Sequence, residues 1–203
     1  MTSLYTLKPR FQALLRPLVG RLASSGITAN AVTLAAMLVS MALGLFLYFE
    51  PDRRLLFLLL PGWMLLRMAL NAIDGMLARE FGQKSTLGAY LNELSDVVSD
   101  AALYLPFVNI APFGWGGIAT IVFLSALSEM AGVLGQVVGA ERRYDGPMGK
   151  SDRALVFGAL GLWVGASAEL PAWLFWLMPA MAAAIAANIW NRIRGGLEQA
   201  RQH

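Results

Sequence analysis

Two stretches of the sequence carry polar and ionisable side chains at helical spacing inside otherwise apolar segments. The first set is Arg67, Asn71 and Asp74, and the second set is Asn92, Asp96 and Asp100. Steps of three and four residues place each set on one face of a helix. Carboxylates in such a place can hold a cation or accept a proton, and ionisable groups are rare inside a membrane span. Each of these residues is therefore a candidate functional residue.

The two helices that carry these residues are expected to form an antiparallel hairpin. The loop between them, residues 80–87, is short, so their polar faces can oppose each other near the membrane surface. Gly75, Ala78 and Gly88 lie beside the polar faces. Small residues let two helices, or a helix and a flat ligand, come close together. Plain helix packing explains each small residue alone, whereas a ligand pocket explains the cluster better.

The overall composition indicates a membrane protein. The chain has 203 residues, of which 57% are hydrophobic and 14% charged, against roughly 25% charged in soluble domains. It has no cysteine, and its one histidine, His203, is the last residue, which argues against disulfides, thiolate metal sites and a histidine-based triad. Lysine and arginine lie in clusters between apolar stretches, which favours anionic lipid or phosphorylated substrates over nucleic acid.

Six apolar runs approach the length of about 20 residues that crosses a bilayer. We expect spans at 29–49, 55–78, 89–110, 116–139, 153–168 and 170–191. Because backbone polar groups must be satisfied internally in lipid, these spans should be helices. The predicted fold is an all-α integral membrane protein with six transmembrane helices.

The first 27 residues differ from a signal peptide and form a separate region. Leucine and phenylalanine recur there at helical spacing among four basic residues, which predicts an amphipathic helix lying in the membrane interface. A helix packed on the cytoplasmic face of the protein is the alternative, and the two are compatible. The predicted organisation is thus a juxtamembrane helix, 1–27, and a transmembrane domain, 28–203.

The distribution of basic residues predicts the orientation. With six spans, 13 of the 16 lysines and arginines fall on the side that holds both termini, whereas Arg53 and Arg54 fall on the other side. Basic residues favour the cytoplasmic side. Both termini are therefore expected in the cytoplasm.

Residues 71–96 resemble the signature of the CDP-alcohol phosphatidyltransferase family, which reads D-x2-D-G-x2-A-R, a short loop, and then G-x3-D-x3-D. The matching residues are Asp74, Gly75, Ala78, Arg79, Gly88 and Asp96. The first and third aspartates of the pattern are Asn71 and Asn92 here. Residues 26–33 also resemble the start of the first span in the family. The likeness is greatest to members from bacterial inner membranes, which implies a multi-pass protein of that membrane.

The resemblance implies an enzyme that moves a phosphatidyl group from CDP-diacylglycerol, or a related CDP-alcohol, to a small alcohol and releases CMP. It implies one or two Mg²⁺ or Mn²⁺ ions, with Asp74 and Asp96 as catalytic residues: Asp96 as the base and Asp74 as principal metal ligand. Asn71 and Asn92 keep a neutral oxygen that Mg²⁺ can use. Asp100 is a further candidate ligand, and the alternative for it is a buried ion pair with Arg67.

The resemblance also assigns a CDP-binding set. This set is Thr33, Asn71, Asp74, Gly75, Ala78, Arg79 and Gly88. Arg79 could pair with the pyrophosphate. Its alternative role is only to mark the cytoplasmic boundary of the span.

The basic loop at 140–153 is a candidate site for the acceptor alcohol. Lys150, Arg153 and Arg142 are the predicted acceptor-binding residues, and they mildly favour a phosphorylated acceptor. The alternative is an ordinary cytoplasmic loop that holds anionic lipid. Glu129, alone in the fourth span, is expected to pair inside the bundle.

Two other functions compete with catalysis. Loss of two carboxylates at Asn71 and Asn92 would suit a protein that binds CDP-lipid in a regulatory role. A transporter is disfavoured, because the sequence shows no internal repeat and the polar residues lie near one membrane surface. Members of the family often form homodimers, so a second copy of the chain is an expected partner besides the bilayer and the substrates.

Overall fold

The computed structural model describes residues 4–201, and every regular element in that range is helical. His203 lies outside the described residues. The seven α-helices are α1 (Leu4–Ser24), α2 (Ala29–Phe49), α3 (Leu59–Glu80), α4 (Thr86–Tyr104), α5 (Gly114–Val137), α6 (Lys150–Ala166) and α7 (Leu177–Ala200). Three short 3-10 helices are η1 (Arg54–Leu58), η2 (Leu105–Asn109) and η3 (Ala172–Trp176). The prediction of an all-α fold is confirmed.

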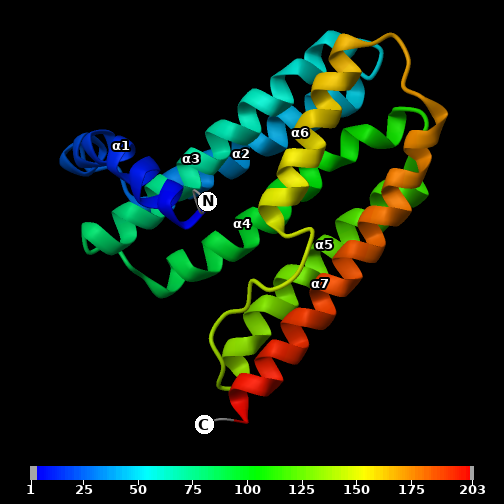
Figure 1. Ribbon diagram of the computed structural model, residues 1–203. Coiled ribbons are helices and arrows are strands. Elements are labelled where there is room, and N and C mark those ends of the chain that lie inside the picture. The colour runs from blue at the N-terminus through cyan, green and yellow to red at the C-terminus, as the bar shows by residue number, and fades with distance from the viewer. Residues whose placement is uncertain (1–3, 202–203) are drawn as a thin grey trace.

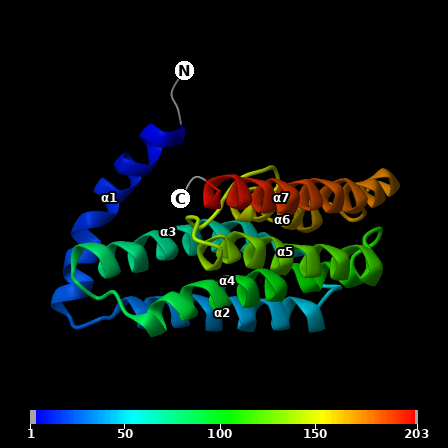
Figure 2. The same cartoon turned by 90° about the horizontal axis from the view of Figure 1, so that it is seen from below.

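Helices α2 to α7 run alongside one another and form the bundle (Figures 1 and 2). Within it α2 packs on α4, α5 packs on α7, and α3 packs on α6. The loops 81–85 and 138–149 lie at the end of the bundle where α7 also ends, and Figure 1 shows α5 and α7 diverging from α3 there. We call this the loop end of the bundle.

Hydrogen bonds at the loop end fix where the helices with the candidate residues begin. The hydroxyl of Ser85 accepts from the Gly88 N–H at 2.9 Å and caps α4. The side-chain oxygen of Gln83 accepts from the Ala29 N–H at 2.7 Å at the start of α2. At the start of α6, the Asp152 carboxylate accepts from the Gly149 N–H at 3.0 Å. Such caps satisfy the free N–H groups of a first turn.

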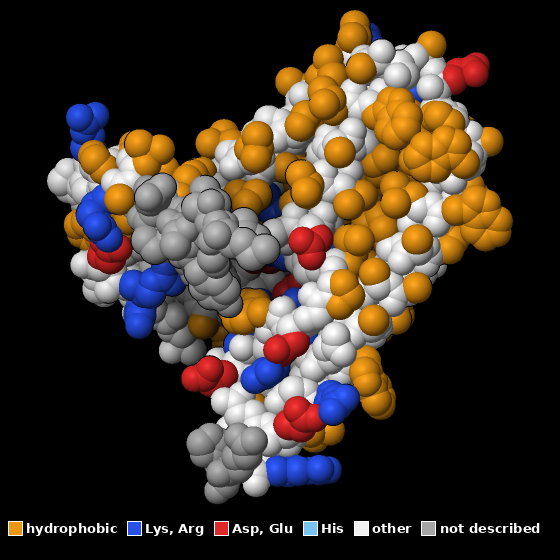
Figure 3. Space-filling model, viewed as in Figure 1, with side chains coloured by type: hydrophobic (Ala, Val, Ile, Leu, Met, Phe, Trp, Pro, Cys, Tyr) orange, Lys and Arg blue, Asp and Glu red, His pale blue; other side chains and the backbone are white. Residues whose placement is uncertain are grey.

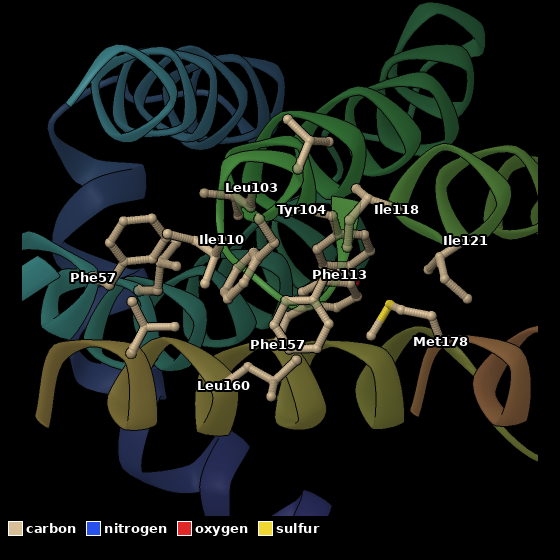
Figure 4. Close-up of a cluster of buried hydrophobic side chains, with 14 of the residues drawn as sticks. Phe57, Leu103, Tyr104, Ile110, Phe113, Ile118, Ile121, Phe157, Leu160 and Met178 are labelled. Atoms are coloured by element: carbon tan, nitrogen blue, oxygen red, sulfur yellow. The ribbon is translucent and has the colours of Figure 1, made fainter. Parts of the chain in front are cut away.

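An aromatic core closes the middle of the bundle beneath the polar residues (Figure 4). The rings of Tyr104 and Phe157 stack with centroids 3.8 Å apart, and Phe107 meets Phe157 edge-on. Tyr104 lies one helical turn beyond Asp100 on α4, and Phe157 lies one turn beyond Arg153 on α6. The core therefore forms an apolar floor directly below these two charged residues.

The outside of the bundle is apolar in the way that a membrane requires. Large apolar side chains such as Leu65 and Leu155 are 69% and 74% exposed, and Figure 3 shows such side chains covering much of one face. Exposed aromatic residues gather at the end opposite the loop end. They include Phe49, Trp115, Trp173 and Trp176. Tryptophan is enriched where a protein meets the membrane interface.

Four helical segments are long and apolar enough to cross a membrane. They are Ala29–Phe49, Arg54–Glu80, Gly114–Val137 and Ala172–Ala200. The other two expected spans are also helical, but α4 carries three acidic residues and α6 has 17 residues. The protein is thus a multi-pass membrane protein, and crossing by α4 and α6 stays a prediction.

Helix α1 lies across the direction of the bundle helices and projects away from them (Figure 2). It is attached to α3, since Val19 is fully buried in a cluster with Ile73 and Leu77. Arg16 also forms an ion pair with Glu80 at 3.1 Å. The opposite face of α1 leaves Leu14 76% exposed. Packing on the protein is therefore observed, and placement in the membrane interface stays a prediction.

Candidate active site

Asp96, on α4, is surrounded by nitrogen donors from two other helices. Its Oδ1 accepts from Nη2 of Arg67 and from Nδ2 of Asn71, both at 3.3 Å. Its Oδ2 pairs with the ammonium group of Lys150 at the start of α6. Nη2 of Arg67 also donates to the backbone carbonyl of Asp96 at 3.1 Å. The side chain is therefore held in place by partners on α3 and α6.

Asp100, one turn deeper on α4, joins two buried arginines. Its Oδ1 lies 2.5 Å from Nη1 of Arg67, and its Oδ2 lies 3.4 Å from Nη2 of Arg153. The ion pair with Arg67, which was the alternative considered for Asp100, is present. The carboxylate thus links α3, α4 and α6 at the level of the aromatic floor.

Glu129, on α5, pairs with three arginines. Its Oε1 lies 2.9 Å from Nη2 of Arg153, and its Oε2 lies 3.3 Å from Nη1 of Arg192 and 3.4 Å from Nη2 of Arg142. The expectation that Glu129 pairs within the bundle is confirmed. Because these arginines come from α6, α7 and the 138–149 loop, one carboxylate ties three elements to α5.

The 138–149 loop is attached to the neighbouring helices through two of its side chains, Arg142 and Arg143. Arg143 pairs with Asp145 at 2.7 Å and donates to the side chain of Gln199 on α7 at 2.9 Å. The adjacent Arg142 reaches Glu93 on α4 at 2.6 Å. The Arg142 guanidinium also lies 4.8 Å from the centre of the Tyr144 ring. The sequence could not assign these partners, because they depend on the path of the loop.

These contacts form one ion-pair network, whose members are Arg67, Glu93, Asp96, Asp100, Glu129, Arg142, Lys150, Arg153 and Arg192. It contains five cations and four carboxylates, and it runs without a break across α3, α4, α5, α6 and α7. Figure 3 shows charged side chains inside a hollow on the viewed face. Buried charges need such partners, because an unpaired charge away from water is costly.

A cavity of about 370 Å³ adjoins the network at the loop end. Its polar lining includes Asn71, Asn92, Asp96, Glu129, Arg142, Tyr144, Lys150, Ser151 and Arg192. Two of the predicted acceptor-binding residues, Lys150 and Arg142, thus face the cavity. The third, Arg153, has no exposed surface and lies beneath it. Arg192, Tyr144 and Ser151 were not selected from the sequence; the only signal for Arg192 was its place in a basic cluster.

Apart from Asn71, the predicted CDP-binding residues are not part of the lining of this cavity. The hydroxyl of Thr33 on α2 donates to Oδ2 of Asp74 at 2.7 Å, and both side chains are buried. The guanidinium of Arg79 folds back over Gly75, where a methyl group would come within 3.0 Å of it. A methyl group at Gly88 would come within 2.9 Å of the Asn30 side-chain oxygen. These glycines therefore bring polar side chains close to the helix backbone.

The oxygen donors suit one divalent cation better than two. Asp74 and Asp96 supply two carboxylates, and Asn71 and Asn92 supply neutral amides. Mg²⁺ is usually held by one or two carboxylates with phosphate and water completing its shell. Among residues 4–201, no group of three or more acidic or histidine side chains is placed to share an ion. The donor types suit a single ion, and their placement does not form a metal site of three or more such ligands.

The fold and the site define a multi-pass membrane protein with a charged site between its helices. The sequence profile of the family described as CDP-alcohol phosphatidyltransferase matches residues 26–190. The chain belongs to this family, whose members transfer a phosphatidyl group from a CDP-alcohol. The resemblance inferred from residues 71–96 is therefore confirmed.

Three relatives illustrate the similarity. Inner membrane protein YnbA of Escherichia coli (strain K12) is 46% identical over 191 residues, which cover 94% of this chain and 93% of the relative. An uncharacterized protein of Aquifex aeolicus is 35% identical over 127 residues, 61% of each chain. The phosphatidylinositol phosphate synthase of Mycobacteroides abscessus is 30% identical over 112 residues, 55% of this chain and 49% of the relative.

Proposed function

We propose that the protein transfers the phosphatidyl group of CDP-diacylglycerol to a small alcohol and releases CMP. The observation that supports this most is the position of Asp96. It is the last aspartate of the family signature, it is half-buried between α3 and α6, and it borders a cavity with basic walls. A base and an anion-binding surface are thus adjacent, as transfer between two phosphorylated substrates requires.

Asp96 acts as the base in this proposal. It takes the proton of the acceptor hydroxyl, the freed oxygen forms a bond to the lipid-linked phosphorus, and the bond from that phosphorus to CMP breaks. CMP leaves with the electron pair of that bond. General base catalysis of this kind contributes about 10²- to 10⁴-fold to a rate. Arg67 and Asn71 orient the carboxylate through their contacts with Oδ1.

A divalent cation, Mg²⁺ or Mn²⁺, would be held by Asp74 and Asp96, with Asn71 and Asn92 as neutral donors. When bound, such an ion neutralises the pyrophosphate and stabilises CMP as the leaving group. We place Asp100 in the ion-pair network, since both of its oxygens already accept from arginines.

The CDP part of the donor is proposed to lie along α2 and α3. Thr33 fixes the orientation of Asp74. Gly75 and Gly88 let the polar side chains of Arg79 and Asn30 lie close to the helix backbone, where with the small Ala78 they would contact the nucleotide. Arg79 is the cation on this side and would meet the pyrophosphate.

The acceptor is proposed to occupy the cavity, and its basic lining favours an alcohol that carries a phosphate. Lys150, Arg142 and Arg192 bring three cations to the cavity wall. Arg153 supports them from below through Glu129. The relative named phosphatidylinositol phosphate synthase is in agreement with a phosphorylated acceptor.

Release of CMP tests the proposed reaction. Purified protein with CDP-diacylglycerol and Mg²⁺ or Mn²⁺ is expected to release CMP in the presence of one of three acceptors: glycerol phosphate, inositol phosphate or serine. Asp96→Asn should lower this rate at least about a hundredfold, because the base is lost. Asp52→Asn is the matched control, since Asp52 is exposed at the opposite end of the bundle. Folded protein that releases no CMP with any acceptor would contradict the proposal.

A second candidate function is binding of CDP-lipid without turnover. Two observations favour it: Asn71 and Asn92 carry no charge, and both oxygens of Asp96 already have nitrogen partners. Such a protein would hold the nucleotide lipid as a regulator. Binding of CDP-diacylglycerol without CMP release would support this role.

Restoring the two aspartates distinguishes the two functions. If Asn71→Asp together with Asn92→Asp raises CMP release, the present site has lost activity and binding is its main role. The proposed enzyme predicts the opposite, because two added carboxylates disturb a site that is balanced as it stands. Its rate should fall at least about tenfold, as expected for about 1.4 kcal/mol of lost stabilisation. Thermal unfolding of the double variant, alone and with CDP, checks that it is folded.

We further propose that all six segments cross a bacterial inner membrane with both termini in the cytoplasm. Basic residues gather at the loop end, and the exposed Trp115, Trp173 and Trp176 lie at the other end. Of the two arginines at that other end, Arg54 is used to hold the end of α6, since its Nε donates to the Ser167 carbonyl at 2.9 Å. A homodimer stays a prediction from the resemblance.

Labelling of single cysteines tests this topology directly, because the chain has no cysteine of its own. Glu141 lies in the 138–149 loop before α6 and Glu169 lies in the turn after α6, and both are exposed. In intact cells, a membrane-impermeant maleimide should label Glu169→Cys and should label Glu141→Cys only after permeabilisation. Labelling of both variants from the same side would contradict six spans.

A further inference from the structure

We propose that Lys150 is a resident counter-ion that competes with the divalent cation for Asp96, so that loading of the metal depends on an anionic ligand in the cavity. The inference concerns how the site is regulated. It rests on the proposed function only in taking Asp96 as a ligand of a divalent cation.

The contact itself supplies the first step. Lys150 places its ammonium group on Oδ2 of Asp96, whereas Arg67 and Asn71 donate to Oδ1. Both oxygens of the carboxylate are therefore engaged by nitrogen donors. A cation that binds Asp96 must share these oxygens or displace one of the donors.

Lys150 is the partner that can leave. The Arg67 side chain is only 5% exposed, and its guanidinium is held by Asp100 as well as by the backbone of Asp96. The Lys150 side chain is 28% exposed and faces the cavity. An ammonium group at the end of four flexible methylene groups moves at little cost, unlike a guanidinium held in a fork.

The backbone of Lys150 stays in place while its side chain moves. The preceding Gly149 N–H is held by Asp152 at 3.0 Å. The carbonyl of Met148 accepts from Nη1 of the buried Arg153 at 3.1 Å. The start of α6 is thus a fixed base from which the ammonium group can reach either Asp96 or a ligand in the cavity.

The charges of the site show why a resident counter-ion is needed. The ion-pair network has five cations and four carboxylates, and Asp74 beside it adds a fifth carboxylate. These ten groups are neutral together without any metal ion. Aspartates at 71 and 92 would add two negative charges, which is the charge of one divalent cation. Asparagine at both positions lets Lys150 satisfy Asp96.

The consequence is an order of binding. Without a ligand, Lys150 and a divalent cation oppose each other at Asp96, so the affinity for metal is low. The phosphate group of an acceptor in the cavity attracts Lys150, and Asp96 becomes available to the cation. The metal is then bound mainly when an anionic substrate is present.

Binding of Mn²⁺ to the purified full-length protein, followed by the EPR signal of free Mn²⁺, tests the proposal without any measurement of turnover. The variants are Lys150→Gln, Lys150→Arg and the control Lys84→Gln, which removes the same charge from an exposed loop residue. Without glycerol phosphate, Lys150→Gln should bind Mn²⁺ at least about tenfold more tightly than the natural protein, because a positive charge in contact with the ligand is removed. Lys150→Arg and Lys84→Gln should resemble the natural protein.

Added glycerol phosphate, a phosphorylated acceptor for the cavity, should tighten Mn²⁺ binding more in the natural protein than in Lys150→Gln, since the variant has no counter-ion left to displace. Equal Mn²⁺ affinity in these two proteins, or no Mn²⁺ binding in any variant, would overturn the proposal. Thermal unfolding shows that each variant is folded. Absence of CMP release together with tighter Mn²⁺ binding by Lys150→Gln would defeat the proposed reaction and leave this inference standing.

Discussion

Arg153 has no exposed surface, and its guanidinium lies between carboxylates that come from two different helices. Through Asp100 it connects to Arg67 and Asp96, and through Glu129 it connects to Arg142 and Arg192. In lipid there is little hydrophobic force to bring helices together, so polar contacts and close packing carry more of the association. Without Arg153, Asp100 would lose one of its two cations and Glu129 one of its three. The aromatic floor beneath Arg153 shields its ion pairs from water on the side that faces the middle of the bundle.

The same network explains how the protein can place the proposed base, Asp96, beside a basic cavity. Asp96 is oriented by partners on α3 and α6, and the cavity cations on the loop and α7 are oriented by Glu129. Asn71 and Asn92, which depart from the family signature, fit this arrangement, because they leave the charges balanced by side chains of the protein itself. The departures therefore suit the proposal that the site is neutral at rest and would receive one divalent cation together with an anionic substrate.

The sequence predicts those features that depend on residues close together in the chain, and it does not predict contacts between distant segments. Apolar runs and polar spacing are local properties, so all six expected segments are helices. The expected hairpin of α3 and α4 is only partly present: their polar side chains meet at Asp96, but α4 packs on α2 and α5 and not directly on α3. The sequence leaves two roles open for Asp100, a metal ligand or an ion pair with Arg67. Sequence spacing does not give the distance between side chains on different helices, so only the packing of the helices distinguishes these roles. Arg192 and Tyr144 were missed because they reach the cavity only through the packing of α7 and the path of the loop. Arg153 was assigned to the acceptor from its place in a basic loop, whereas packing of α6 buries it completely.

The ion pairs of Arg153 hold both the bundle and the site together, and the free energy of unfolding in detergent measures how much they contribute. Arg153→Met should lower this free energy by about 3–5 kcal/mol, because Asp100 and Glu129 then lose a buried partner. Arg194→Met, which removes an exposed ion pair with Glu198, serves as the matched control and should leave stability unchanged. Combining Arg153→Met with Glu129→Gln should cost clearly less than the sum of the two single changes, since both remove the same interaction. Wild-type stability in Arg153→Met, or additive effects in the double variant, would contradict the account.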